Sequence, residues 1–311
     1  MAGKIVVVGS FVYDLIVWLL YFPQRGETLL ASEFKMVAGG KGFNQAVSAR
    51  RCGAQVSMIE KVGADQFGTA FTEILQREGI DQRFVSRDAS TTTTLGIPMI
   101  DPNEDNSIIG VPRGHTLVTV AQVNRAAEFI SQHDILMLQL EIPLEAARIA
   151  HQAGLTVILN PAPAAFPLSA LLLRDGVHEP LIDWLVPNEV EAEKLSNLPV
   201  KSTEEAVISA RAILSQGVRQ GVVITMGSNG VVAVTPSAQY YQPAFPVAPV
   251  DPTGAGDAFC GSFAAALSEG RNIEQALHFA TAAGALAVTI AGAEPSLLER
   301  SKIEAFLRDH A

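Results

Sequence analysis

Cysteine is scarce in this chain of 311 residues, where only Cys52 and Cys260 occur. Two isolated cysteines form no CxxC pair, so they provide neither a zinc site nor a disulfide framework. Such low usage is typical of proteins from a reducing compartment, and we therefore expect a cytoplasmic protein.

Basic residues are in deficit, because 22 lysines and arginines stand against 32 acidic residues and give a formal net charge of −10. Binding to nucleic acid requires a local basic patch, and no Lys/Arg cluster supplies one here. We expect no nucleic-acid partner. A single small anion held in a pocket remains compatible with this composition.

Long apolar runs are missing as well. The stretch Leu15–Phe22 is too short to span a bilayer, and it follows Asp14 without the basic start and small-residue cleavage site of a signal peptide. No membrane partner is expected. The hydrophobic share of 48% and the charged share of 17% are typical of a globular enzyme with a sizeable core.

Two common nucleotide-binding motifs are absent. Gly9 ends an apolar run but begins no GxGxxG, which argues against a Rossmann dehydrogenase. The glycine-rich segment around Lys41 is not a Walker loop, because Gly42 stands where Ser or Thr would have to bind magnesium.

Strand-like and helix-like segments alternate along most of the chain. The expected strands are 4–9, 55–62, 135–140, 156–160, 184–187, 222–226 and 231–234, and the expected helices are 42–51, 69–78, 144–153, 190–195, 258–267 and 273–288. Such repetition predicts an α/β fold with three αβα layers and a mainly parallel central sheet. We expect residues 1–311 to form one domain.

Two extended excursions interrupt this alternation, at about 11–35 and 91–111. We expect them to pair as a small β-sheet lid over the carboxyl edge of the main sheet, where open α/β folds bind ligands. The lid segment Val17–Leu20 is apolar, and a short sheet exposing it needs a cover. A homodimer through the lid is therefore predicted.

The segment Asp251–Asp257 precedes a helix rich in alanine and glycine. Gly254, Ala255 and Gly256 can present amides at the start of that helix, which together with the helix dipole form an anion site. Asp257 would lie beside the anion and accept a hydroxyl proton during phosphoryl transfer. The alternative is a tight glycine turn in which Asp257 merely caps the helix.

A second glycine-rich turn contains Gly40, Lys41 and Asn44 at another helix start, a pattern suited to binding hydroxyls or oxyanions. Asp14 and Glu141 follow predicted strands, where carboxylates accept pairs of sugar hydroxyls. The alternatives are a plain turn with a surface lysine, and solvated loop acids.

Asn188 and Glu191 lie three residues apart at a helix start. They fit a capping box and, equally, a magnesium–phosphate role if they converge on the anion site. The segment Thr225–Gly230 ends a strand and suits backbone contacts to a nucleotide, although Asn229-Gly230 is also a good turn.

Taken together, these motifs resemble the ribokinase-like (phosphofructokinase-B type) sugar kinases, and within them the ribokinase branch. The matching segments occur in the same order over nearly the whole chain: 8–10, 39–46, 139–141, 160–163, 187–191, 251–257 and 292–296. The resemblance implies ATP-dependent phosphorylation of the primary hydroxyl of a sugar, in an αβα domain with a β lid that commonly dimerises.

The same resemblance implies roles for individual residues. Asp257 would be the base, and Gly254, Ala255 and Gly256 would form its anion hole. The sugar would be bound by Asp14, Gly40, Lys41, Asn44, Glu141 and Asp257. ATP would contact Asn188, Thr225, Gly227, Ser228, Gly230, Gly256 and Thr281, with Glu191 serving Mg²⁺. An activating K⁺ would be held by Asp251, Thr253, Ala287, Ile290, Gly292 and Ser296.

Two positions depart from the ribokinase pattern. Val12 stands where ribokinases usually carry Asn, and Phe43 replaces a small residue of the glycine-rich turn. Loss of a hydrogen-bond partner shifts substrate preference, so the best pentose need not be ribose, and deoxyribose is a candidate. Other functions left open are a nucleoside or ketohexose kinase and a non-catalytic sugar-binding regulator.

Overall fold

The computed structural model describes residues 2–102, 106–111, 118–164, 173–174, 177–178 and 180–310. Within these residues the main sheet has nine strands in the order β15-β14-β13-β12-β9-β8-β1-β4-β5. The strands are β1 (Lys4–Val8), β4 (Gln55–Gly63), β5 (Asp81–Asp88), β8 (Ile135–Gln139), β9 (Thr156–Asn160), β12 (Trp184–Leu185), β13 (Gly221–Thr225), β14 (Val231–Val234) and β15 (Gln239–Gln242).

The sheet is mainly parallel, as predicted, and only β14 and β15 pair antiparallel with their neighbours. Its central strands β1 and β8 are almost continuously apolar, because helices cover both faces. Residues 103–105 of the lid segment 91–111 lie outside the described part of the chain.

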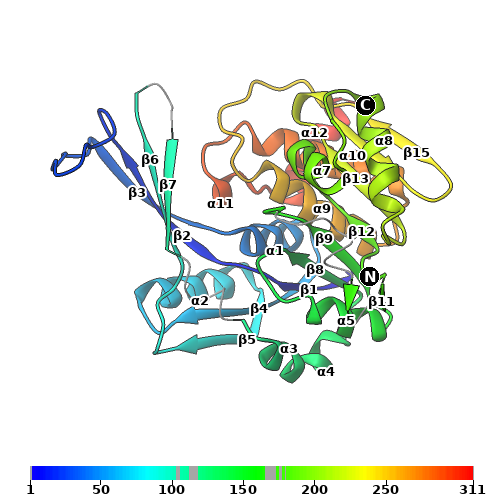
Figure 1. The fold of residues 1–311 in the computed structure, drawn as a ribbon, viewed down its shortest axis with the longest axis horizontal. Helices are drawn as coiled ribbons and strands as arrows, with labels where there is room; N and C mark the ends of the chain where they lie inside the picture. Colours follow the sequence, from blue (N-terminus) through cyan, green and yellow to red (C-terminus); the bar gives the residue numbers. More distant parts are fainter. Residues whose placement is uncertain are drawn as a thin grey trace.

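Helices form a layer on each face of the sheet (Figure 1). One apolar cluster joins the sheet to α1 (Lys41–Arg51), α2 (Gln66–Glu78), α9 (Ala255–Ser268), α10 (Ile273–Ala287) and α12 (Arg300–Asp309). A second cluster joins the opposite face to α3 (Val120–Arg125), α4 (Ala127–Ile130), α5 (Glu145–Gln152), α7 (Glu189–Ser196) and α8 (Thr203–Leu214). The three predicted layers are confirmed.

Three further elements outside the lid are short. They are α11 (Ala293–Ser296), the 3₁₀ turn η2 (Gly227–Asn229) and the hairpin of β10 (Leu173–Arg174) with β11 (Val177–His178). Among the described residues, no helix combines the length and the apolar content needed to cross a bilayer.

The predicted lid is a separate four-stranded sheet with the order β3-β2-β6-β7. Its strands are β2 (Val12–Trp18), β3 (Glu33–Gly39), β6 (Leu95–Ile100) and β7 (Asn106–Val111). Figure 1 shows these long strands projecting away from the main body beside α1 and α11. The first excursion leaves the main sheet directly after β1, so the lid is rooted at the carboxyl edge.

Candidate active site

The start of α1 lies directly against the end of β1. A Cβ added to Gly42 would come within 2.5 Å of the Cα of Gly9, so this contact requires glycine on both sides. Gly40 has φ 98° and lies against the backbone of Val12 in the lid. This close packing brings the first turn of α1 to the carboxyl edge of the sheet, beneath the root of the lid.

The side chain of Asp257, in the first turn of α9, is fixed by two amides from α1. Asn44 Nδ2 donates to its Oδ2 at 2.9 Å, and Gln45 Nε2 donates to its Oδ1 at 3.0 Å. These contacts join residues more than 200 positions apart in the chain. The carboxylate is therefore held in one orientation, as a general base must be.

A buried network of side-chain amides from β8 and β9 supports this carboxylate. Gln139 Nε2 donates to Gln45 Oε1 at 2.7 Å, and Asn160 Nδ2 donates to the carbonyl of Val186 at 2.8 Å. Gln45 also donates to Asn160 Oδ1 at 3.2 Å. Strands β8 and β9 thus fix Gln45, which in turn fixes Asp257. Gln45 and Asn160 lie in segments that carried the family resemblance, but the sequence analysis predicted no role for either.

Burial raises the pKa of the Asp257 carboxyl above its usual value, and Lys41 and the two amide donors partly oppose that rise. Glu141 adds to the rise because it is a second negative charge nearby. A raised pKa makes the carboxylate a better proton acceptor, which suits a general base near neutral pH.

The start of α9 presents free amides beside this carboxylate. Gly254 adopts φ 82°, and the N–H groups of Gly256 and Asp257 donate to no acceptor among the described residues. Ala255 N–H, one of the three predicted anion-hole donors, instead donates to Pro252 O at 3.2 Å. Unpaired amides at a helix start attract anions, and here they lie next to Asp257.

Several polar oxygens at this edge are buried without a partner in the described chain. Asn44 Oδ1 and Glu141 Oε2 are two of them. Buried polar atoms normally have a hydrogen-bond partner, so these acceptors indicate a ligand that brings its own donors. Sugar hydroxyls are such donors.

Asp14 lies inside lid strand β2 rather than in a loop. Its carboxylate covers Gly39 and Gly96, where any Cβ would approach its oxygens to 2.9 and 2.1 Å respectively. Burial raises the pKa of Asp14 to about 6. Val12 lies beside it over Gly96, with Cγ1 3.5 Å from the position of such a Cβ. The lid therefore brings one acid and one apolar group toward the site.

Asn188 and Glu191 form the capping box of α7. The Asn188 side chain accepts from Glu191 N at 2.8 Å, and Glu191 Oε2 accepts from Asn188 N at 3.0 Å. This contact accounts for their spacing. Their role toward magnesium and phosphate stays a prediction.

The predicted nucleotide segment is the turn between β13 and β14. Thr225 N donates to Pro187 O at 3.0 Å, Gly227 and Gly230 both have positive φ, and Ser228 lies between them in η2. Thr281 on α10 has a buried hydroxyl without a partner in the described chain. These contacts position the turn, and its binding of ATP stays a prediction.

The residues predicted to bind potassium form one loop cluster. Asp251 accepts from Thr253 N at 2.9 Å and from Gly292 N at 2.7 Å, which fastens the segment after α10 to the start of α9. Ser296 Oγ donates to Ala293 O, and Ala287 O accepts from Ile290 N. The carbonyls of Thr253, Ile290 and Gly292 accept no hydrogen bond from the described residues, so the cluster fits a cation that binds oxygen.

One carboxyl at this edge was not predicted. Glu60 on β4 is completely buried, and burial holds its pKa well above the usual value, with the nearby Glu141 adding to the effect. Its Oε1 accepts from Phe11 N at 3.4 Å, and its Oε2 has no partner in the described chain. The available signal in the sequence was an acidic residue, Glu60, that follows the apolar pair Met58-Ile59 within a predicted strand.

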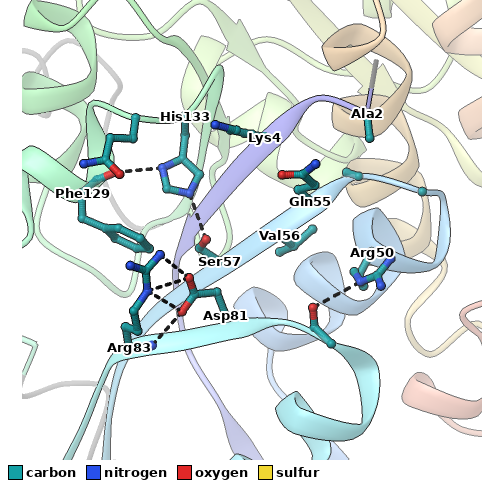
Figure 2. Close-up of a pocket in the computed structure, with 14 residues that line it drawn as sticks. Ala2, Lys4, Arg50, Gln55, Val56, Ser57, Asp81, Arg83, Phe129 and His133 are labelled. Atoms are coloured by element: carbon teal, nitrogen blue, oxygen red, sulfur yellow. Dashed lines mark hydrogen bonds and ion pairs between the residues drawn. The ribbon is translucent and has the colours of Figure 1, made fainter.

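A cavity of about 580 Å³ opens at the opposite, amino edge of the sheet. Figure 2 shows that several of its polar side chains already have partners: Arg83 pairs with Asp81, and His133 lies between Ser57 Oγ and the carbonyl of Phe129. Arg50 donates to Gly79 O at 3.3 Å. Because these groups already have partners, we place the candidate active site at the carboxyl edge.

The described residues contain no group of three or more His, Cys, Asp or Glu that could hold a metal ion.

Comparison with known proteins gives matches along the whole chain. The model of the pfkB family carbohydrate kinases matches residues 2–300. Ribokinase from Bacillus subtilis is 39% identical over 309 residues, covering 98% of this chain and 99% of that protein. Deoxyribokinase from Salmonella typhi is 34% identical over 296 residues, 94% of each chain. The structure of Arabidopsis thaliana ribokinase complexed with ribose and ATP has a TM-score of 0.91 at 31% identity and covers 99% of both chains.

Proposed function

The chain belongs to the pfkB family of carbohydrate kinases, and from this premise we propose that it transfers the γ-phosphate of ATP to a primary hydroxyl of a pentose, ribose or deoxyribose. One observation carries the proposal: the carboxylate of Asp257, fixed by Asn44 and Gln45, lies beside the free amides at the start of α9. A proton acceptor next to an anion site is the arrangement that phosphoryl transfer to a hydroxyl requires.

In the proposed reaction, the pentose hydroxyl oxygen attacks the γ-phosphorus while its proton passes to the Asp257 carboxylate. The bond between the γ-phosphorus and the bridging oxygen breaks, and ADP leaves with that oxygen. The amides of Gly256 and Asp257 stabilise the negative charge on the transferring group. Asp14, Asn44 and Glu141 would accept hydrogen bonds from the other sugar hydroxyls, and Gly40 and Lys41 would contribute to the same sugar site.

Two ions belong to this proposal. When bound, Mg²⁺ neutralises phosphate charge, and Glu191 would help to bind it. Magnesium sites commonly combine one or two carboxylates with the phosphates of the substrate. K⁺ would lie among the oxygens of the loop cluster, where three carbonyls accept no hydrogen bond from the part of the chain that the structure describes. The nucleotide would contact the turn from Thr225 to Gly230 and the hydroxyl of Thr281.

The substrate panel that tests the proposal compares ribose, deoxyribose, fructose and adenosine for ATP consumption, with and without potassium. We expect turnover with a pentose and little with adenosine. Adenosine as the best substrate would assign the chain to nucleoside kinases, and fructose as the best substrate would assign it to ketohexose kinases. Absence of turnover with all four compounds would contradict the proposal.

Val12 is the position at which a substitution best tests the preference between ribose and deoxyribose. Val12 cannot donate or accept a side-chain hydrogen bond, whereas Asn can, and a buried hydrogen bond gained or lost is worth roughly 1–3 kcal/mol. We expect Val12→Asn to raise the ribose-to-deoxyribose ratio of kcat/KM by about 5- to 100-fold. Val12→Leu is the matched apolar control, and an equal ratio in both variants would contradict this role.

We also propose a homodimer through the lid, in a cytoplasmic protein. Three lid side chains support the dimer because they are apolar, more than half exposed and on one face of the lid sheet: Phe34, Met36 and Ile109. A second copy of the lid sheet would cover them. Sedimentation of the wild type and of Phe34→Glu/Ile109→Glu tests this: the wild type should be a dimer and the variant a monomer, and a monomeric wild type would contradict it.

A further inference from the structure

Arg51 is the last residue of α1, and its guanidinium joins three separate elements. Nε and NH2 donate to the two oxygens of Glu78 at the end of α2, at 3.1 and 2.8 Å. NH1 donates to the carbonyls of Leu297 at 2.6 Å and Glu294 at 2.9 Å, and NH2 also pairs with the Glu294 carboxylate. The arginine side chain is only 15% exposed, so these bonds are largely shielded from water.

The segment that Arg51 holds lies against the start of α9. A Cβ added to Gly254 would lie 3.0 Å from the Cα of Ala293, which places segment 292–297 in contact with the turn that presents the free amides. Asp251 fastens the beginning of the same segment through Gly292 N–H. Arg51 and Asp251 therefore hold segment 292–297 from its two ends.

The opposite end of α1 carries Asn44 and Gln45, which hold the Asp257 carboxylate. One rigid helix thus contacts both parts of the site: its first turn contacts the base, and its last residue holds the segment behind the amides. A guanidinium is suited to this position because its planar fork reaches two carbonyls and two carboxylates at once, whereas a lysine ammonium is a single point of charge.

We propose that Arg51 is a positioning residue that fixes segment 292–297 against Gly254 and so aligns the free amides of α9 with Asp257. It does not contact the substrate itself. The proposal deepens the function proposed above and rests on it for its kinetic consequence, whereas its structural consequence is independent of that function.

The kinetic test compares Arg51→Met with Arg77→Met. Arg77 approaches the same two carboxylates, Glu78 and Glu294, at 3.5 Å, but its side chain is 61% exposed. Unlike Arg51, it donates to no backbone carbonyl of segment 292–297 within the described chain. We expect Arg51→Met to lower kcat roughly 10- to 100-fold with the pentose KM changed less than threefold, because misalignment acts on transfer rather than on sugar binding. Arg51→Lys should recover part of kcat, and Arg77→Met should match the wild type.

Hydrogen exchange gives a readout that does not depend on turnover. Peptides covering 250–258 and 288–298 should exchange faster in Arg51→Met than in the wild type or Arg77→Met. Unchanged exchange at 250–258, or a loss of activity that appears only as a higher pentose KM, would overturn the proposal. If Arg51→Met does not fold, the same kinetic and exchange measurements can be made on Glu294→Gln and Arg51→Lys. A wild type without sugar-dependent turnover would refute the proposed function, and the exchange result would still decide the role of Arg51.

Discussion

At the amino edge of the main sheet, several polar side chains around the cavity of Figure 2 have hydrogen-bond partners, whereas at the carboxyl edge several buried polar atoms have none among the described residues. Arg83 is paired with Asp81, and His133 is bonded on both ring nitrogens. Asn44 Oδ1 and Glu141 Oε2 are buried and unpaired. A large polar cavity is therefore a weaker sign of a ligand site than a small group of unsatisfied buried atoms.

Asp257 lies at the carboxyl edge and Asp81 at the amino edge. Substituting each of them gives the strongest test of the difference between the two edges. We expect Asp257→Asn to lower kcat by roughly 10²- to 10⁴-fold, because the amide cannot take the hydroxyl proton. Asp81→Asn should leave kcat and KM within twofold of the wild type, since Asp81 bonds to Arg83 far from the reacting groups. Steady-state kinetics measure both. Equal losses in the two variants would remove the distinction between the edges.

The pH dependence of sugar binding tests the carboxyl edge at Asp14. Burial raises the pKa of this carboxyl to about 6, so it is mainly ionised at pH 7 and mainly protonated at pH 5. The ionised form accepts hydrogen bonds at both oxygens, and we therefore expect pentose affinity to fall about tenfold from pH 7 to pH 5.

Calorimetric titration in the Asp257→Asn background isolates this effect, because the proposed base can then no longer titrate. Adding Asp14→Asn should weaken binding and flatten its pH dependence. A pH dependence that persists unchanged in that double variant would show that another group controls sugar binding.

The smallest expected effect concerns His133 at the amino edge. Burial lowers the pKa of His133, so the unfolded chain takes up its proton at a higher pH than the folded chain does. The free energy of unfolding should therefore fall as pH drops through the unfolded-state value of about 6.5 toward the lower folded value. Urea denaturation of the wild type and His133→Gln at pH 8 and pH 5.5 measures it, and the variant should lose less stability. An equal loss in both proteins would contradict this account of His133.

Much of this architecture could be predicted from local sequence patterns. The apolar runs gave β9 and β14 with their observed bounds, and the glycine-rich turn located the start of α1 to one residue. Strand β5 was missed because Asp81–Asp88 is largely polar and half-buried, so it lacks the apolar alternation that predicts a strand.

The sequence predicted the residues of the site better than it predicted the contacts between them. Asp257 and Asn44 were both named from their motifs, but their hydrogen bond joins distant parts of the chain, and no local pattern encodes such a pairing. Gln45 and Gln139 lie in segments that carried the family resemblance, but their hydrogen bond and their role in holding Asp257 were not predicted, for the same reason. Similarly, the spacing of Asn188 and Glu191 allowed two roles, and the structure shows that the capping box forms.

The most direct test of the central claim is hydrogen exchange with and without a pentose and a non-hydrolysable ATP analogue. If ligands bind at the carboxyl edge beneath the lid, exchange should slow in peptides covering 9–14, 38–46 and 254–258, and it should not change at 53–57 and 79–83. Protection confined to 53–57 and 79–83 would place the ligands in the amino-edge cavity and contradict the assignment.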